Sequence, residues 1–240
     1  PGAWELLQDL LGSWQPYALV HEWKLPDGFD ARVKVMQKKE ARIEVDELDH
    51  ATFTYEFYEN AGTKTGLSNV ANVVDSVDAY ILRSIHRRCN YDREMVQNAY
   101  RMVQSSMNHS ENVTLDIEGK VTYYIKQYER SGVADVVILP YLDSLNVYGL
   151  SLIHRKKLLE IMESMLAYKP FEVVSVHDEF KCHPNNMNHL RQQYINVLAE
   201  LAESNLLDDL LSQLHGSIGS FKKLTPDLGA NIRLSNYALS

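Results

Sequence analysis

The stretch Phe171-Glu-Val-Val-Ser-Val-His177-Asp178-Glu179-Phe180-Lys-Cys182 decides how the fold of this chain is interpreted. It opens with an apolar, β-branched run that is long enough for one buried strand. His177 and Asp178 interrupt the run, and apolar residues then resume with a spacing of two. The pattern predicts a tight hairpin whose bend lifts His177 and Asp178 out of the core into a cleft. A carboxylate on such a rigid turn suits a divalent metal ion, above all Mg²⁺, which prefers oxygen ligands.

Two structures fit these residues taken alone. In one, the His-Asp pair belongs to a metal site, and in the other it marks a strand end that merely meets solvent. A motif of two polar residues is too short to decide between them. Features elsewhere in the sequence are therefore needed to choose between a metal site and an exposed strand end.

A resemblance to a known family favours the metal site. Val176-His177-Asp178-Glu179-Phe180 resembles the palm signature that single-subunit RNA polymerases of phages and mitochondria share with a family of bacterial repair DNA polymerases. The resemblance implies that Asp178 is catalytic and binds the Mg²⁺ pair. It also implies that His177 takes part in catalysis around the primer 3′ end, and that Glu179 supports Asp178 without binding the metal itself.

Composition limits the class of protein. The 240 residues are 45% hydrophobic and 23% charged, which is typical of a globular protein with its own core. No apolar stretch is long enough to span a membrane, and two cysteines without a signal peptide favour the cytoplasm, that of the host cell for a phage protein. The net charge of −8 argues against a nucleic-acid groove formed by this chain alone. Because the chain also starts at Pro1 rather than Met, we expect it to be part of something larger.

Periodicity predicts an α+β arrangement. Amphipathic spacing predicts helices over residues 4–14, 91–107, 152–166, 187–201 and 206–214. Caps are expected at Ser151 and near Asn185, and a C-terminal stop at His215-Gly216. Alternation predicts a strand at 18–24 that the turn Pro26-Asp27-Gly28 closes, and a long two-stranded ribbon over 32–58. It also predicts a hairpin of 113–117 with 121–125 and a short strand at 136–139. The basic run 154–157 is expected to be a solvated helix face, with phosphate contact as the second interpretation.

The resemblance extends to residues 4–84. The segments 20–23 and 25–29 are similar to those that precede the specificity hairpin of phage-type RNA polymerases, and the ribbon follows where that hairpin is expected. Residues 71–83 are similar to the family's Asn-x-x-His-Ser-x-Asp-x-x-x-Leu segment, although Asp75 replaces the His. The resemblance implies nucleic-acid contacts, within this segment and the hairpin, by Asn72, Ser76, Asp78, Arg42 and His50.

The end of the chain and the tip of the ribbon add two expectations. Tyr237-Ala238-Leu239-Ser240 is similar to the short foot that closes phage-type RNA polymerases, although its last two residues differ. The resemblance implies that Tyr237 lies near the active site and the nucleic acid, whereas a frayed terminus is the simpler alternative. The ribbon tip carries three acidic residues, which phosphates repel. A protein partner at this tip is therefore favoured over duplex promoter DNA.

Together the matches predict the C-terminal fingers and palm portion of a right-hand polymerase. Its palm β-hairpin would pack on helices, with a projecting β-hairpin and an inserted α/β segment. The expected divisions are a fingers-derived segment at 1–84 with the specificity-like hairpin at 30–59, an insertion at 85–150, the palm at 151–220, and a docked tail at 221–240.

Nucleotidyl transfer by two metal ions needs two carboxylates from different palm segments and a basic fingers helix that grips the triphosphate. Asp178 supplies only the second carboxylate. The resemblance therefore implies a DNA-dependent RNA polymerase that is inactive as this chain alone. A second subunit or an upstream segment would supply the first Asp and the fingers Lys and Arg, and the complex would bind DNA template, RNA transcript and nucleoside triphosphates.

Two alternatives stay open. One is the palm of a repair-type DNA polymerase, which Glu179 favours and the tail opposes. The other is a non-catalytic, polymerase-like scaffold that regulates a partner, which the acidic ribbon tip favours.

Overall fold

The computed structural model describes residues 10, 18–62, 67–108, 116, 118–176, 179–216, 223 and 225–235, without the side chains of 67–69. The fold is mixed α and β, which confirms the predicted class. Over the described residues, strands pair in three separate two-stranded antiparallel sheets: β1 (Val20–Lys24) with β2 (Asp30–Lys34), β3 (Met36–Val45) with β4 (Ala51–Asn60), and β5 (Val174–Val176) with β6 (Glu179–Lys181).

Helices supply most of the remaining regular structure. The α-helices are α2 (Leu67–Cys89), α3 (Arg93–Ser106), α4 (Lys120–Ser131), α5 (Leu152–Leu166), α6 (Met187–Glu203), α7 (Leu206–His215) and α8 (Leu228–Leu234). Short 3-10 helices are η1 (Asp46–Leu48), η2 (Val136–Tyr141), η3 (Asn146–Gly149) and η4 (Pro184–Asn186). Within the described ranges, no helix combines the length and apolar character that crossing a membrane requires.

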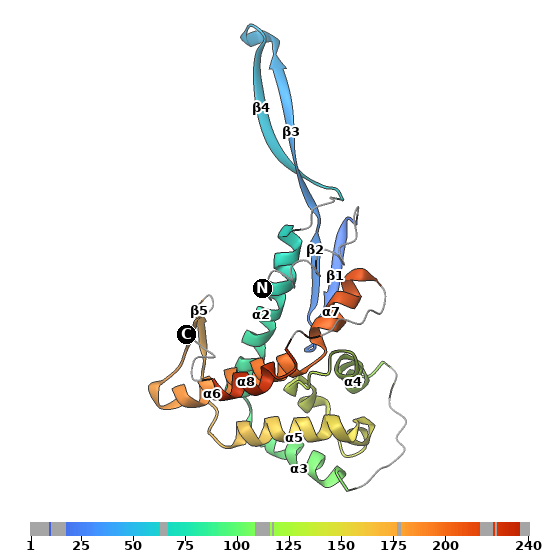
Figure 1. Ribbon diagram of the computed structural model, residues 1–240, viewed down its shortest axis with the longest axis vertical. Helices are drawn as coiled ribbons and strands as arrows, with labels where there is room; N and C mark the ends of the chain where they lie inside the picture. Colours follow the sequence, from blue (N-terminus) through green and yellow to red (C-terminus); the bar gives the residue numbers. More distant parts are fainter. Residues whose placement is uncertain are drawn as a thin grey trace.

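The described core consists of three groups of buried apolar side chains. One lies between α3, α4, η2, η3 and α5, the second joins β1, β2 and α2 to α7, and the third joins the end of α2 to α6 and the β5–β6 hairpin. Helix α2 thus contributes to two of the three groups. Figure 1 shows the β3–β4 hairpin extending away from this body.

Several predicted elements are confirmed. The helix over residues 152–166 is α5, and Ser151 caps it because its Oγ accepts a hydrogen bond of 3.2 Å from the His154 amide. Helix α7 ends at Gly216, whose φ of 72° is left-handed. Gly28 has a φ of 81° in the turn between β1 and β2, as the predicted Pro-Asp-Gly turn requires.

Two predictions within the segment 85–150 are wrong. Residues 121–125 lie in α4 rather than in a hairpin strand, because Val121 and Ile125 are one helical turn apart and both are buried. Residues 136–139 form η2 rather than a strand, because the Asp135 carboxylate accepts a hydrogen bond of 2.9 Å from the Val137 amide and starts a turn.

Other predictions fall partly outside the described residues or need adjustment. The helix expected at 4–14 and the strand expected at 113–117 lie outside them, except for Leu10 and Asp116. The cap expected near Asn185 is wrong for α6, which has no side-chain cap, since His183 Nδ1 instead accepts the Asn185 amide at 3.3 Å and starts η4. The boundary expected at residue 84 lies inside α2.

The basic run at 154–157 is largely internal, so both interpretations of its first two residues are wrong. His154 and Arg155 are 2% and 3% exposed. The Arg155 guanidinium donates hydrogen bonds to the carbonyl oxygens of Leu150 (2.9 Å), Tyr148 (2.9 Å) and Ser106 (2.6 Å). It therefore joins α5 to η3 and to the end of α3. Backbone carbonyl oxygens, rather than a phosphate, therefore stabilise the charge of this guanidinium.

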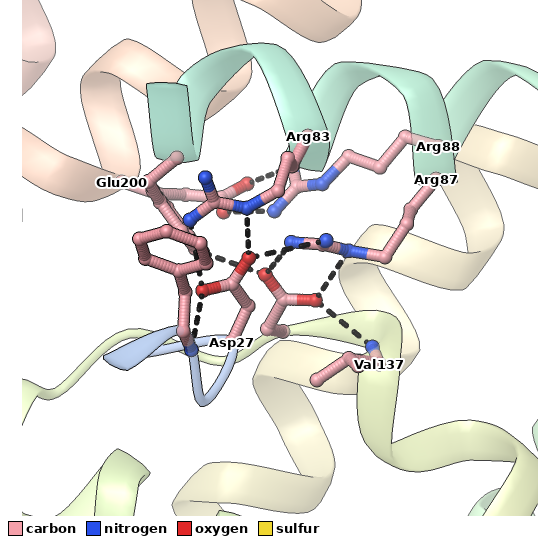
Figure 2. Close-up of polar contacts among 9 residues, drawn as sticks. Asp27, Arg83, Arg87, Arg88, Val137 and Glu200 are labelled. Atoms are coloured by element: carbon pink, nitrogen blue, oxygen red, sulfur yellow. Dashed lines mark hydrogen bonds and ion pairs between the residues drawn. The ribbon is translucent and has the colours of Figure 1, made fainter. Parts of the chain in front are cut away.

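Three arginines of α2 join this helix to three other segments through ion pairs that are largely shielded from water (Figure 2). Arg83 Nε lies 2.6 Å and Arg87 Nη1 lies 3.2 Å from Asp27 Oδ2, in the turn between β1 and β2. Arg87 Nη2 also lies 2.8 Å from Asp135 Oδ2, at the start of η2. The side chains of Asp27 and Asp135 are 4% and 3% exposed, so these pairs are largely shielded from water.

The third arginine joins α2 to α6. Arg88 is 1% exposed and donates two parallel hydrogen bonds, of 2.8 and 2.5 Å, to the Glu200 carboxylate. Burial opposes the charge on Asp135, but the charge and hydrogen bonds of Arg87 outweigh burial and lower the pKa of this carboxyl. Asp135 is therefore ionised beside Arg87, and the ion pairs together fix the position of α2 against α6, η2 and the first sheet.

Removing one charge from this network is expected to destabilise the fold strongly. Asp135→Asn removes a carboxylate that is 3% exposed and leaves Arg87 with one of its two carboxylate partners, and we expect a loss of about 3 kcal/mol in the free energy of unfolding. Asp30→Asn is the matched control, because Asp30 is 65% exposed in its pair with Lys24, and it should cost about 1 kcal/mol or less. Urea denaturation measures both values. Equal costs would show that the buried network does not constrain the fold.

His154 is expected to make the fold sensitive to acid. It stacks on Tyr128 with ring centroids 3.7 Å apart, and burial, followed by the charge of Lys157, lowers its pKa to about 3. The unfolded chain binds the proton near the ordinary value of about 6.5. The contribution of His154 to the free energy of unfolding is therefore fully present above pH 6.5 and is lost as the pH falls toward 3.

The substitution His154→Phe keeps the stacked ring and removes the titration. Between pH 7 and pH 5 its free energy of unfolding should fall by about 2 kcal/mol less than that of the wild type. His215→Phe, at the exposed end of α7, is the control and should keep the pH dependence of the wild type. Parallel pH profiles for wild type and His154→Phe would contradict the expectation.

Candidate functional site

The β5–β6 hairpin contains the sequence motif on which the functional interpretation depends. Val174 pairs with Lys181, Ser175 with Phe180, and Val176 with Glu179. The two strands are therefore joined by residues 177 and 178 alone, which confirms the predicted tight hairpin. Strand β5 is shorter than the apolar run from Phe171 suggests. His177 and Asp178 themselves lie outside the described residues.

Two helices hold this hairpin in place. Phe180 of β6 meets Tyr194 of α6 edge to face, with ring centroids 5.7 Å apart. Before β5, the Phe171 amide donates a hydrogen bond of 2.9 Å to the carbonyl of Cys89, the last residue of α2. Because the buried Arg88–Glu200 pair joins the same two helices, the base of the hairpin is fixed on both sides.

The cysteines beside the hairpin fit a structural role. Cys89 is fully buried, and burial raises the pKa of its thiol to about 12. A thiol is a nucleophile only as its thiolate, so Cys89 is inert at neutral pH. Burial also raises the pKa of Cys182. Both residues pack among apolar side chains at the end of α2.

The outer side of the hairpin is open. Val174 and Val176 are 58% and 43% exposed, although β-branched apolar residues favour a covered sheet. Glu179 is exposed, and its carboxylate lies 3.3 Å from Lys181 Nζ. A hairpin of two three-residue strands is marginal on its own. The hairpin thus has the form of an incomplete sheet whose uncovered face combines two valines with the Glu179–Lys181 ion pair.

The predicted nucleic-acid residues of α2 lie on different sides of this helix. Ser76 is buried, and its hydroxyl accepts a hydrogen bond of 2.9 Å from Trp23 Nε1 and donates one of 2.6 Å to the Val73 carbonyl. Asn72 is half-buried, whereas Asp75 and Asp78 are exposed. The hydroxyl of Ser76 thus serves the contact between α2 and β1, and nucleic-acid contacts by this set stay a prediction.

The predicted residues of the projecting hairpin lie far from the others. Arg42 is exposed and donates a hydrogen bond of 2.9 Å to Thr52 Oγ1 across the strands. His50 is exposed at the tip, where its Nδ1 lies 2.8 Å from Glu44 Oε1 and 3.3 Å from Asp46 Oδ1. Figure 1 shows this tip well separated from β5. The structure therefore does not bring Arg42 and His50 together with the β5–β6 hairpin.

The described part of the C-terminal segment packs beside α6. Arg233 of α8 forms an ion pair with Glu203 of α6. The backbone approaches closely at Gly229, where a Cβ atom would lie 2.5 Å from Glu203 Cγ. Tyr237 lies outside the described residues. Helix α8 thus contacts the helix that supports the β5–β6 hairpin (Figure 1).

Side chains able to bind a metal ion come together at one place among the described residues. The only cluster there of three side chains able to hold a metal ion is Glu44, Asp46 and His50, all exposed at the tip of the β3–β4 hairpin. Glu179 belongs to no such cluster among those residues. Asp178, the residue expected to bind metal at the β5–β6 hairpin, lies outside the residues compared.

Sequence reasoning did not find the Arg88–Glu200 pair that supports the hairpin. The two residues are 112 positions apart, and neither belongs to a motif. Their pairing follows from the packing of α2 on α6, which periodicity does not specify.

Neither the protein-family models nor the curated proteins compared with this sequence match it.

Proposed function

We propose that this chain is the C-terminal part of a phage-type DNA-dependent RNA polymerase. In this proposal Asp178 supplies the second carboxylate of a site that binds two Mg²⁺ ions. One observation supports it above the others: β5 and β6 are joined only by His177 and Asp178, and α2 and α6 hold the base of the hairpin. A catalytic metal ligand requires support from anchored elements of this kind on either side of it.

The open side of the hairpin supports an assembly with a companion polypeptide. The exposed Val174 and Val176 are suited to packing against a further palm segment. That segment would carry the first carboxylate. The net charge of −8 supports a companion that also carries the basic side chains that would grip template, transcript and triphosphate. An upstream segment of the same chain would serve equally, and the complex would work in the cytoplasm of a phage-infected cell.

The chain's own residues would divide the work at the site. Asp178 would bind both metal ions, and His177 would position the primer 3′ end. Glu179, already paired with Lys181, would hold the turn in place. When bound, the two Mg²⁺ ions activate the attacking 3′ hydroxyl and neutralise the charge on the leaving pyrophosphate.

Substitution of Asp178 in the assembled enzyme tests this function. Asp178→Asn keeps the size of the side chain and removes its charge, so RNA synthesis from a DNA template should fall about 10³-fold or more. Glu179→Gln, which removes only the neighbouring charge, should cost about tenfold. Sedimentation of the complex checks that both variants still assemble.

Other results would select another function. Normal RNA synthesis by the Asp178→Asn enzyme would contradict the proposed role of this residue. Incorporation of deoxyribonucleotides in preference to ribonucleotides would favour a repair-type DNA polymerase. A wild-type complex that assembles and binds template but synthesises nothing would favour the non-catalytic scaffold.

A further inference from the structure

The β3–β4 hairpin has one apolar face and one polar face. Residues opposite each other in an antiparallel pair point to the same side. Ile43 is opposite Phe53, Ala41 is opposite Tyr55, and Val45 is opposite Ala51. The other side carries polar pairs such as Arg42 with Thr54 and Glu44 with Thr52. The sequence alternation of the hairpin thus produces a continuous apolar strip on a ten-residue ribbon.

This apolar strip is uncovered in the described part of the chain. Ile43, Phe53 and Tyr55 are 47%, 53% and 47% exposed, and Phe57 is 37% exposed. Figure 1 shows the ribbon projecting beyond the helices, so its strands have no layer to pack on. Isolated two-stranded ribbons are marginally stable, and exposed apolar strips mark surfaces that bind another molecule.

The charge of the ribbon indicates what kind of molecule this is. Residues 36–60 contain seven carboxylates and three Lys or Arg side chains. Two of those cations are already paired, Lys38 with Glu56 at 2.7 Å and Lys39 with Glu59. Near the tip, Glu44, Asp46, Glu47 and Asp49 are all exposed. This distribution repels phosphates and also repels a second copy of the same ribbon.

A protein surface that is apolar with basic side chains around it would match both the apolar strip and the acidic tip. The companion polypeptide of the proposed polymerase has to carry the basic walls that this acidic chain does not supply. Its surface would therefore complement the acidic tip, while apolar side chains on it would cover the strip.

We infer that the apolar face of the β3–β4 hairpin docks on the companion polypeptide, at an apolar surface bordered by Lys and Arg. This inference rests on the proposed function. The hairpin then acts as an arm that holds two halves of one enzyme together, with Phe53 and Tyr55 as central contacts and the acidic tip as the steering element.

Matched substitutions on the two faces of the ribbon test the inference. The double variant Phe53→Ser and Tyr55→Ser removes the apolar strip and should weaken the Kd between the two polypeptides about 30-fold or more. Tyr58→Ser is the control, because Tyr58 is 67% exposed on the polar face, and it should change the Kd less than about twofold. A tip variant, Asp46→Asn with Glu47→Gln, should slow association and reduce its dependence on salt.

Calorimetry and sedimentation velocity measure these constants on the full chains, with circular dichroism as a check on folding. Equal Kd values for the two faces would overturn the inference. So would loss of binding to single- or double-stranded DNA oligonucleotides in the double variant alone, because the strip would then contact nucleic acid. Self-association of the chain that only the double variant abolishes would identify a second copy as the occupant.

A separate readout distinguishes failure of this inference from failure of the proposed function. RNA synthesis is measured with both polypeptides at concentrations above every Kd. A complex that synthesises RNA but binds equally well with either face substituted overturns the docking inference alone. A complex that depends on the strip for assembly, yet synthesises no RNA, overturns the polymerase proposal alone.

Discussion

The position of α2 depends on the requirement that buried charges be paired. Arg88 is almost fully buried, and the carboxylates of Asp27 and Asp135 are nearly so. An unpaired ion in such surroundings would cost several kcal/mol, so each charge fixes its partner's segment. Arg87 bridges Asp27 and Asp135, and Arg88 forms a two-bond pair with Glu200. One helix thus sets the positions of the first sheet, η2 and α6 together.

The β5–β6 and β3–β4 hairpins lie at different ends of the body that these ion pairs hold together. The β5–β6 hairpin rests on α6 and on the last residue of α2. The β3–β4 hairpin follows the first sheet, whose turn is held by Arg83 and Arg87. Buried contacts anchor the base of the β5–β6 hairpin, whereas the projecting ribbon has an uncovered apolar face. Both hairpins expose apolar side chains, which is why an assembly with another polypeptide explains more of the surface than a chain that acts alone.

Local chemistry made part of the fold predictable. The cap at Ser151, the glycine stop at Gly216 and the turn at Gly28 are each determined by a few neighbouring residues. The strand pairs of both long and short hairpins followed from alternation. Residues 121–125 were predicted as a strand because valine, tyrosine and isoleucine favour strands. They are helical because a helix buries Val121 and Ile125 on the same face, and this packing outweighs the local preference.

Contacts distant in sequence were beyond the same reasoning. Asp27 was recognised as a turn residue, but its carboxylate binds arginines 56 and 60 positions away. The buried state of Arg155 was missed for a related reason, since its three carbonyl partners come together only after η3 and α3 pack on α5. For the candidate site, sequence similarity suggested Asp178 and its neighbours, and the geometry added the anchored, incomplete hairpin around them.

Metal-directed cleavage of the proposed complex tests most directly whether Asp178 binds the catalytic metal ions. Fe²⁺ replaces Mg²⁺, and ascorbate with peroxide generates hydroxyl radicals that cut the backbone next to the bound ion. If Asp178 binds the catalytic metal ions, this chain is cut within and beside residues 174–181, and excess Mg²⁺ suppresses the cuts. Cuts confined to the tip around Glu44 and His50, with none near the β5–β6 hairpin, would contradict this role of Asp178.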